Sequence, residues 1–420
     1  MRDVYVLSEI SKLPGSRESR IFRGHISELD AIRGLGIGLV LINHFWPEKS
    51  AFVFQLGQLG WIAMDAFFVL SGFLITGILL DSQARPDYFS NYYIRRALRI
   101  FPLYYLTLLL GIVMLKLEAG GSAYRSFVQN WGSPGWFFVY LGNIKESIVG
   151  QTPPNVYFSV LWSLQIEEQF YLLFPFLIRY MRRDHLVRLL WCLVFLSPVC
   201  RLLFYLWVPD KVMIQYVLLP CHMEGLALGA LIAIRFRSGS WEIPKAPLMA
   251  GTGLLLLVTS LGSYFSKSPS PGMSCISLFA RLPGYTMSSF GCAGLVLCLI
   301  LFRGSPYTRL LRTPAVRYMA VISYGIYLLH PLVSRFVRSW DVPALDYGTY
   351  LRFFVAASLS VAAASVSWFA FERPLARLKD RIAPRLTPSD SKSAVPETQP
   401  SVLNRDLQGS ELAPAEASGS

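Results

Sequence analysis

The stretch MDAFFVLSGFLITGILL, residues 64–80, decides the fold class. Asp65 is its only charged residue, and with the preceding residues 60–63 it reaches the length of about 20 residues that crosses roughly 30 Å of hydrocarbon. Comparable stretches recur near 29–46, 95–116, 156–179, 187–208, 213–234, 247–265, 284–302, 316–336 and 350–371. They predict an all-α polytopic membrane protein with about ten transmembrane helices, and the ionisable residues inside them predict a polar central cavity.

The composition of the whole chain excludes a soluble protein. Of 420 residues, 53% are apolar and 15% are charged, where soluble domains carry about a quarter. The mean hydropathy is +0.44. We expect a cytoplasmic N-terminal segment at 1–28, a membrane domain at 29–375 and a disordered cytoplasmic tail at 376–420, which is rich in Pro, Ser, Ala and Glu.

The net charge of +13 is distributed as a topology signal. Basic clusters lie at 2–23, 85–99, 182–188, 235–245, 303–317 and 373–385, so basic and less basic connections alternate along the chain. The positive-inside rule then places both termini in the cytoplasm, and we expect no nucleic-acid partner. The longest connection expected on the outer side, 117–155, contains Gly, Pro and Trp and is expected to hold a re-entrant or interfacial segment.

The six cysteines show no C-x-x-C pair, and we expect neither a disulfide framework nor a metal site. His222 and Glu224 are two residues apart and therefore on different helix faces. An interhelical polar pair explains them better than a shared metal.

Arg33 and His44 lie on one face of the first predicted helix. They are eleven residues apart, which leaves them about 20° apart around the axis and about 16 Å apart along it. Asp65 opens the next helix from the same outer side, where a carboxylate would hold one His44 tautomer and raise its basicity. Snorkelling of Arg33 and an interfacial position of His44 explain this pair equally well.

Two further polar groups lie in the third and fourth predicted helices. Arg96 and Arg99 share a face at the cytoplasmic end, which indicates either positive-inside anchoring or a ligand with several phosphates. Glu167 and Glu168 lie within an apolar span and favour an inward-facing polar site. Ser71 falls about 240° around its helix from Asp65, so we do not assign it as a nucleophile, and neighbouring Gly72 indicates close helix packing.

These motifs together resemble the membrane acyltransferase 3 family, the O-acetyltransferases of bacterial surface polysaccharides, Nod factors and macrolides. The resemblance covers about residues 28–375 and rests on the Arg33-x10-His44 element, on D-x-FFVLSGFLIT from 65, on RRxxRIxP at 95–102, on SLxxEEQFY at 163–171 and on SYxxYLxHP at 323–331. One departure is His222-Met-Glu224, where the family pattern has Arg-x-Asp.

The resemblance implies an O-acyltransferase in the bacterial inner membrane. Acyl-CoA, with acetyl-CoA expected, would be the cytoplasmic donor, and the acceptor would be a hydroxyl of a saccharide or glycolipid. We assign Arg33, Arg96 and Arg99 to acyl-CoA binding. His44 is the expected general base, oriented by Asp65, and Glu167 either completes the polar cavity or handles a second proton; a covalent acyl-imidazole at His44 is the variant mechanism.

Two other classes of protein stay open. A transporter or flippase would also bury Arg, His, Asp and Glu along a pathway, but often shows inverted repeats and broken helices. A non-catalytic scaffold would not need so many ionisable groups within the membrane.

Overall fold

The computed structural model describes residues 26–46, 60–153, 157–238, 243–266, 277–340 and 350–384. The described part of the chain is helical and has no β-strand. Most of the predicted N-terminal segment and of the predicted disordered tail lies outside the described residues. The long helices are α2 (Ser27–Phe45), α4 (Trp61–Ser82), α5 (Tyr88–Leu117), α9 (Trp162–Tyr180), α10 (Arg183–Trp207), α12 (Met223–Phe236), α13 (Lys245–Phe265), α14 (Tyr285–Leu301), α15 (Pro314–Arg338) and α16 (Tyr350–Ser367).

Each of the ten predicted spans contains a helix, but only seven spans among the described residues are long and apolar enough to cross a membrane. These comprise α4, α5, α10, α13, α15, α14 with the π-helical turn before it, and α16 with the segment after it. The other predicted spans contain α2 and α9, which carry three charged residues each, and α12, which has 14 residues. The chain is a multi-pass membrane protein, and ten crossings stay a prediction.

The predicted span at 213–234 is broken. The short helix α11 (Val212–Val217) ends before the 3-10 turn Leu219–Cys221, and α12 begins at Met223. Pro220 explains the interruption because it lacks a backbone N–H and fixes its φ angle. The break places His222 at the start of α12.

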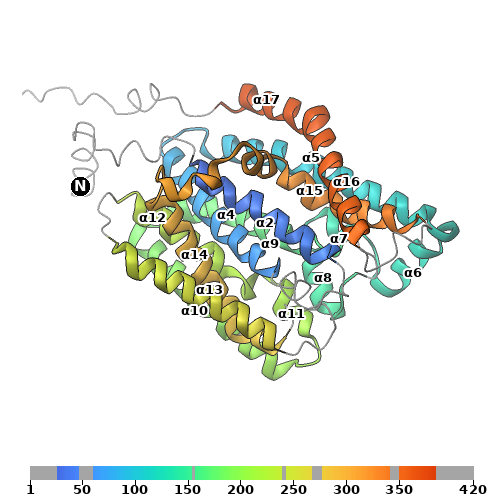
Figure 1. The fold of residues 1–420 in the computed structure, drawn as a ribbon, viewed down its shortest axis with the longest axis horizontal. Coiled ribbons are helices and arrows are strands. Elements are labelled where there is room, and N and C mark those ends of the chain that lie inside the picture. Colours follow the sequence, from blue (N-terminus) through green and yellow to red (C-terminus); the bar gives the residue numbers. More distant parts are fainter. Residues whose placement is uncertain are drawn as a thin grey trace, which may run out of the picture. The chain divides into compact units, whose positions relative to one another are not determined.

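Helix α4 lies in the middle of the bundle, with α2 on one side and α12 on another (Figure 1). Two glycines allow α4 and α12 to touch along their backbones. A Cβ atom at Gly72 would lie 2.0 Å from the Leu226 carbonyl oxygen, and one at Gly229 would lie 2.0 Å from that of Val69. The close packing predicted for Gly72 is confirmed.

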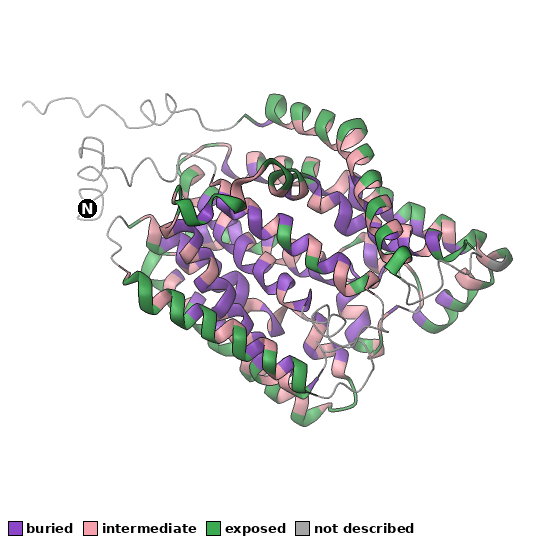
Figure 2. Ribbon diagram, in the orientation of Figure 1, coloured by how far each residue is buried: buried purple, intermediate pink, exposed green. Residues whose placement is uncertain are grey.

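Burial follows this arrangement. The most apolar stretch of α4 is 72% buried, whereas those of α10 and α13 are 22% and 17% buried. Figure 2 shows α13 with a largely exposed outer side and α4 almost entirely buried. In a membrane protein, apolar residues on such an outer side face lipid, so exposed leucines along α13 are expected there.

Short helices complete the described chain. The predicted outer connection contains α6 (Ser122–Trp131), α7 (Gly135–Phe138) and α8 (Gly142–Val149). After α16, the π-helical turn Trp368–Glu372 leads into α17 (Arg373–Ile382), so helix continues past the predicted domain boundary at 375. Arg95 on α5 pairs with Asp380 on α17 at 2.9 Å.

Candidate functional site

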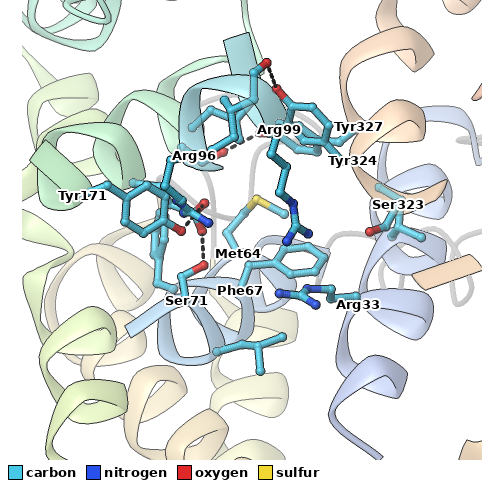
Figure 3. Close-up of a pocket in the computed structure, with 17 residues that line it drawn as sticks. Arg33, Met64, Phe67, Ser71, Arg96, Arg99, Tyr171, Ser323, Tyr324 and Tyr327 are labelled. Carbon is cyan, nitrogen blue, oxygen red and sulfur yellow. Dashed lines mark hydrogen bonds between the residues drawn. The ribbon is translucent and has the colours of Figure 1, made fainter. Parts of the chain in front are cut away.

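A cavity of about 130 Å³ lies among α2, α4, α5, α9 and α15. Its lining combines polar and charged groups with apolar side chains such as Ile37 and Phe67 (Figure 3). The charged and polar lining residues are Arg33, Ser71, Arg96, Arg99, Ser163, Glu167, Tyr171, Ser323, Tyr324 and Tyr327. Three guanidinium groups face a single lining carboxylate, so the cavity favours an anionic ligand.

Arg33, Arg96 and Arg99 reach the cavity from two helices. Figure 3 shows the guanidinium groups of Arg33 and Arg99 extending toward its centre near Phe67. Arg99 is exposed, and Arg33 and Arg96 are half-buried. The Arg96 guanidinium carbon lies 3.6 Å from the centre of the Tyr171 ring, a cation–π contact that fixes this side chain.

Glu167 is held by two hydroxyl donors. Ser71 donates a hydrogen bond of 2.7 Å to Oε1, and Tyr171 donates one of 3.0 Å to Oε2. Both carboxylate oxygens are therefore occupied, and the side chain is fixed between α4 and α9. The sequence does not indicate this role of Ser71, because nothing in it shows that the side of α4 carrying Ser71 meets α9.

One end of the cavity is lined by Ser163 and Tyr327, whose hydroxyl oxygens lie 2.6 Å apart. The Tyr327 ring centre lies 5.9 Å from that of His330 on the next turn of α15. The His330 ring in turn lies 4.9 Å from that of His44, at an angle of 69°. His44 thus lies beyond this end of the cavity, next to a second imidazole, and its side chain is exposed.

The predicted contact between Asp65 and His44 is corrected by the structure. Asp65 lies on the side of α4 that faces α12, and its Oδ1 is 3.9 Å from Nδ1 of His222. Asp65 is not among the five α4 residues that line the cavity, which are Met64, Phe67, Phe68, Leu70 and Ser71. The side chains of Asp65 and Met64 point in different directions because successive residues are 100° apart around a helix.

Asp65 belongs to a second polar cluster between α4, α10, α12 and α14. Arg201 forms a bidentate pair with Glu224 at 2.7 and 3.2 Å, and Thr286 donates to Glu224 at 3.0 Å. Arg201 and Glu224 are fully buried. The interhelical pairing expected for His222 and Glu224 is confirmed by these contacts.

The sequence profile of the acyltransferase 3 family, described as an acyltransferase domain, matches residues 26–370. The chain belongs to this family. No protein of solved structure matches it.

Among relatives of this acyltransferase 3 protein, YrhL of Bacillus subtilis (strain 168), named for peptidoglycan O-acetylation, is 28% identical over 374 residues, covering 84% of this chain and 55% of YrhL. The peptidoglycan O-acetyltransferase OatA of Listeria monocytogenes is 28% identical over 341 residues, covering 76% and 51%. The acyltransferase MdmB of Streptomyces mycarofaciens is 24% identical over 406 residues, covering 88% and 92%. The chain therefore spans about half the length of the first two relatives and most of the third.

Within the acyltransferase 3 fold of this chain, four of the six predicted site residues line one cavity: Arg33, Arg96, Arg99 and Glu167. His44 lies beyond the end of the cavity that Tyr327 lines and is next to His330, which lies beside Tyr327. Asp65 lies on the side of α4 that faces His222. In the SYxxYLxHP motif, Ser323, Tyr327 and His330 follow each other at helical spacing on one side of α15, a pattern that does not indicate the partner of His330.

Proposed function

We propose that the protein is a membrane-bound O-acyltransferase that moves a short acyl group, expected to be acetyl, from cytoplasmic acyl-CoA to a hydroxyl of a saccharide or glycolipid. The observation that carries the proposal is the cavity. The cavity brings three guanidinium groups and a fixed carboxylate together. Beyond Tyr327, His330 contacts His44, which lies about 16 Å from Arg33 along the same helix.

The shape and charge of the cavity suit part of acyl-CoA. Its volume is below the roughly 300–1,000 Å³ typical of sites that enclose a whole drug-sized ligand. A thin pantetheine arm fits such a space better than a nucleotide. In this proposal Arg33, Arg96 and Arg99 hold phosphate oxygens at the inner end, and the arm extends toward Ser163 and Tyr327.

The reaction needs two proton transfers and one exchange of bonds at carbon. His44 takes the proton of the acceptor hydroxyl, whose oxygen forms a bond to the thioester carbonyl carbon. The carbon–sulfur bond then breaks, and the thiolate takes up the proton from His44. Glu167 completes the polar lining of the cavity or handles a second proton, and Asp65 would act through His222 and the packing of α12. Positioned general bases contribute about 10²–10⁴-fold to rate.

The test is turnover by the purified protein in nanodiscs, with acetyl-CoA, a bacterial envelope glycan as acceptor, and thiol release as the readout. We expect His44→Ala to lower acyl transfer at least about 100-fold, while the protein still inserts and purifies as a single species. His185→Ala, an exposed histidine on α10, is the matched control and should retain activity. Wild-type turnover in His44→Ala would refute the assignment of the base.

The alternative is a transporter or flippase, which the broken helix between α11 and α12 favours. Flux of acceptor glycolipid across liposomes without acyl-CoA, together with no thiol release, would support it. Mass spectrometry of envelope glycans with and without the gene would identify the acceptor. A single O-linked mass increment that depends on the gene is the result expected from acyl transfer.

A further inference from the structure

Among the described residues, His330 contacts the proposed base, His44, and no contact between His44 and an acidic side chain is found. The His44 and His330 ring centres are 4.9 Å apart in an edge-to-face arrangement, and the centre of the Phe45 ring is 6.0 Å from that of His330. His330 is 1% exposed, whereas His44 is exposed, so only the His330 side of the contact is shielded from bulk solvent. The two imidazoles come from α2 and α15, which pack against each other along their lengths.

The backbone selects the same tautomer for both rings. Nδ1 of His44 lies 3.0 Å from the carbonyl oxygen of Val40, and Nδ1 of His330 lies 3.1 Å from that of Ile326. A carbonyl oxygen can only accept, so each Nδ1 carries the hydrogen and each neutral ring has a lone pair on Nε2. Nε2 of His330 is buried and has no hydrogen-bond partner among the described residues.

No ion pair between either imidazole and a carboxylate occurs among the described residues. Asp65 lies instead against His222 on α12. Glu146 on α8 acts electrostatically on Tyr327, and burial raises the pKa of Glu146 well above its usual value. The usual carboxylate partner of a histidine base is therefore replaced at this position by an imidazole.

We propose that His330 is the positioning residue of His44, an inference that rests on the proposed acyl transfer. When the acceptor hydroxyl gives its proton to Nε2 of His44, that ring becomes a cation. The neutral His330 ring lies against it and stabilises the cation through its electron-rich face and its Nε2 lone pair. The proton then returns from His44 to the leaving thiolate, and His330 is unchanged.

The position of His330 also connects the base to the cavity. Tyr327 precedes it by three residues on α15, lines the cavity and lies beside Ser163. A shift of His330 would therefore move both the His44 ring and the end of the cavity that Tyr327 lines.

Two substitutions separate an electronic role from packing. His330→Gln keeps a lone-pair acceptor and loses the ring, whereas His330→Phe keeps the ring and loses the lone pair. We expect His330→Phe to lower kcat about 10–100-fold with an unchanged KM for acetyl-CoA, as is typical for loss of a group that orients a functional side chain. His330→Gln should retain more activity than His330→Phe. A role in packing alone gives the opposite order and would overturn the proposal.

A double-mutant cycle provides the second test. If His330 acts through His44, then His330→Phe should cause no further loss of residual turnover in a His44→Ala background. Multiplicative losses would contradict the proposal. Equal elution profiles and melting temperatures of the variants control for misfolding. If His44→Ala keeps full activity, the proposed function fails. If His44→Ala loses activity but the His330 variants keep wild-type activity, only the role of His330 is refuted.

Discussion

Arg95 and Arg96 are neighbours in the sequence and have opposite environments. Arg95 pairs with Asp380 on α17, whereas Arg96 lines the cavity and stacks on Tyr171. Arg99, one turn further along α5, also lines the cavity, and no ion pair to it is found within the described residues. The helical spacing places Arg96 and Arg99 on the cavity side of α5, whereas Arg95 faces α17.

Replacement of Arg99 tests this distinction. We expect Arg99→Ala to raise the KM for acetyl-CoA roughly 10–100-fold, since a hydrogen bond to a charged group contributes about 1.5–3 kcal/mol. The change in kcat should be smaller. Arg95→Ala is the matched control, because an ion pair near the surface contributes about 0–1 kcal/mol, and its KM should stay within about twofold. Equal KM values for both variants would remove Arg99 from the donor site.

The sequence identifies single residues better than their partners. Arg33, Arg96, Arg99 and Glu167 could be selected because ionisable groups in apolar helices are costly, and they do line one cavity. The pairing of Asp65 with His44 was wrong, because it depended on how α4 is rotated about its axis. That rotation is set by contacts between Gly72 and Leu226, which are far apart in the chain. Ser71 was missed for the same reason.

At the scale of helices, the length of an apolar stretch predicts well where a helix lies, but it does not predict whether that helix is continuous. Every long helix lies within or close to a predicted span, but α12 is separated from α11 by the turn Leu219–Cys221. The average hydropathy of a span does not reveal such a break, although Pro220 indicates where it occurs. Charged residues likewise leave α2 and α9 outside the set of clearly apolar spans, and these two helices carry Arg33 and Glu167.

The contact between α4 and α12 is open to a direct test. Gly72→Ala places a Cβ atom 2.0 Å from a backbone oxygen, so we expect it to destabilise the protein by at least about 1–3 kcal/mol and to lower its Tm. Gly38→Ala in α2 is the control, because nothing lies within 4 Å of the added atom. It should leave Tm unchanged or raise it, since alanine favours helix by about 0.5–1 kcal/mol. An unchanged Tm for Gly72→Ala would contradict the described contact.

At the scale of the whole molecule, an ion pair ties the end of α5 to α15. Arg335 and Tyr157 each donate a hydrogen bond of 2.5 Å to Oε1 of Glu118. Burial raises the pKa of Glu118, but these two donors outweigh burial and hold the pKa below its ordinary value of 4.5. The unfolded carboxyl therefore binds its proton at a higher pH than the folded one does, and protonation favours unfolding.

The expected consequence is a stability difference that depends on pH. Glu118→Gln should lower Tm by a constant amount at pH 6–8, where Glu118 is ionised in both states. The difference from the wild type should shrink as the pH falls below about 4.5 and through the lower pKa of the folded state. Thermal melts in detergent across this range provide the measurement. A difference that grows toward acid pH would show that Glu118 does not contribute in this way.

The two glycine contacts between α4 and α12 also constrain how the protein admits its donor. Backbones that touch at Gly72 and at Gly229 cannot slide past each other without steric overlap, so this pair forms a stationary wall. Transient widening of the cavity would then come from its other walls, which are α2 together with α5, α9 and α15, the last three meeting through tyrosine hydroxyls and side-chain contacts. Substrate would accordingly enter and leave through movement of these helices and not of α4.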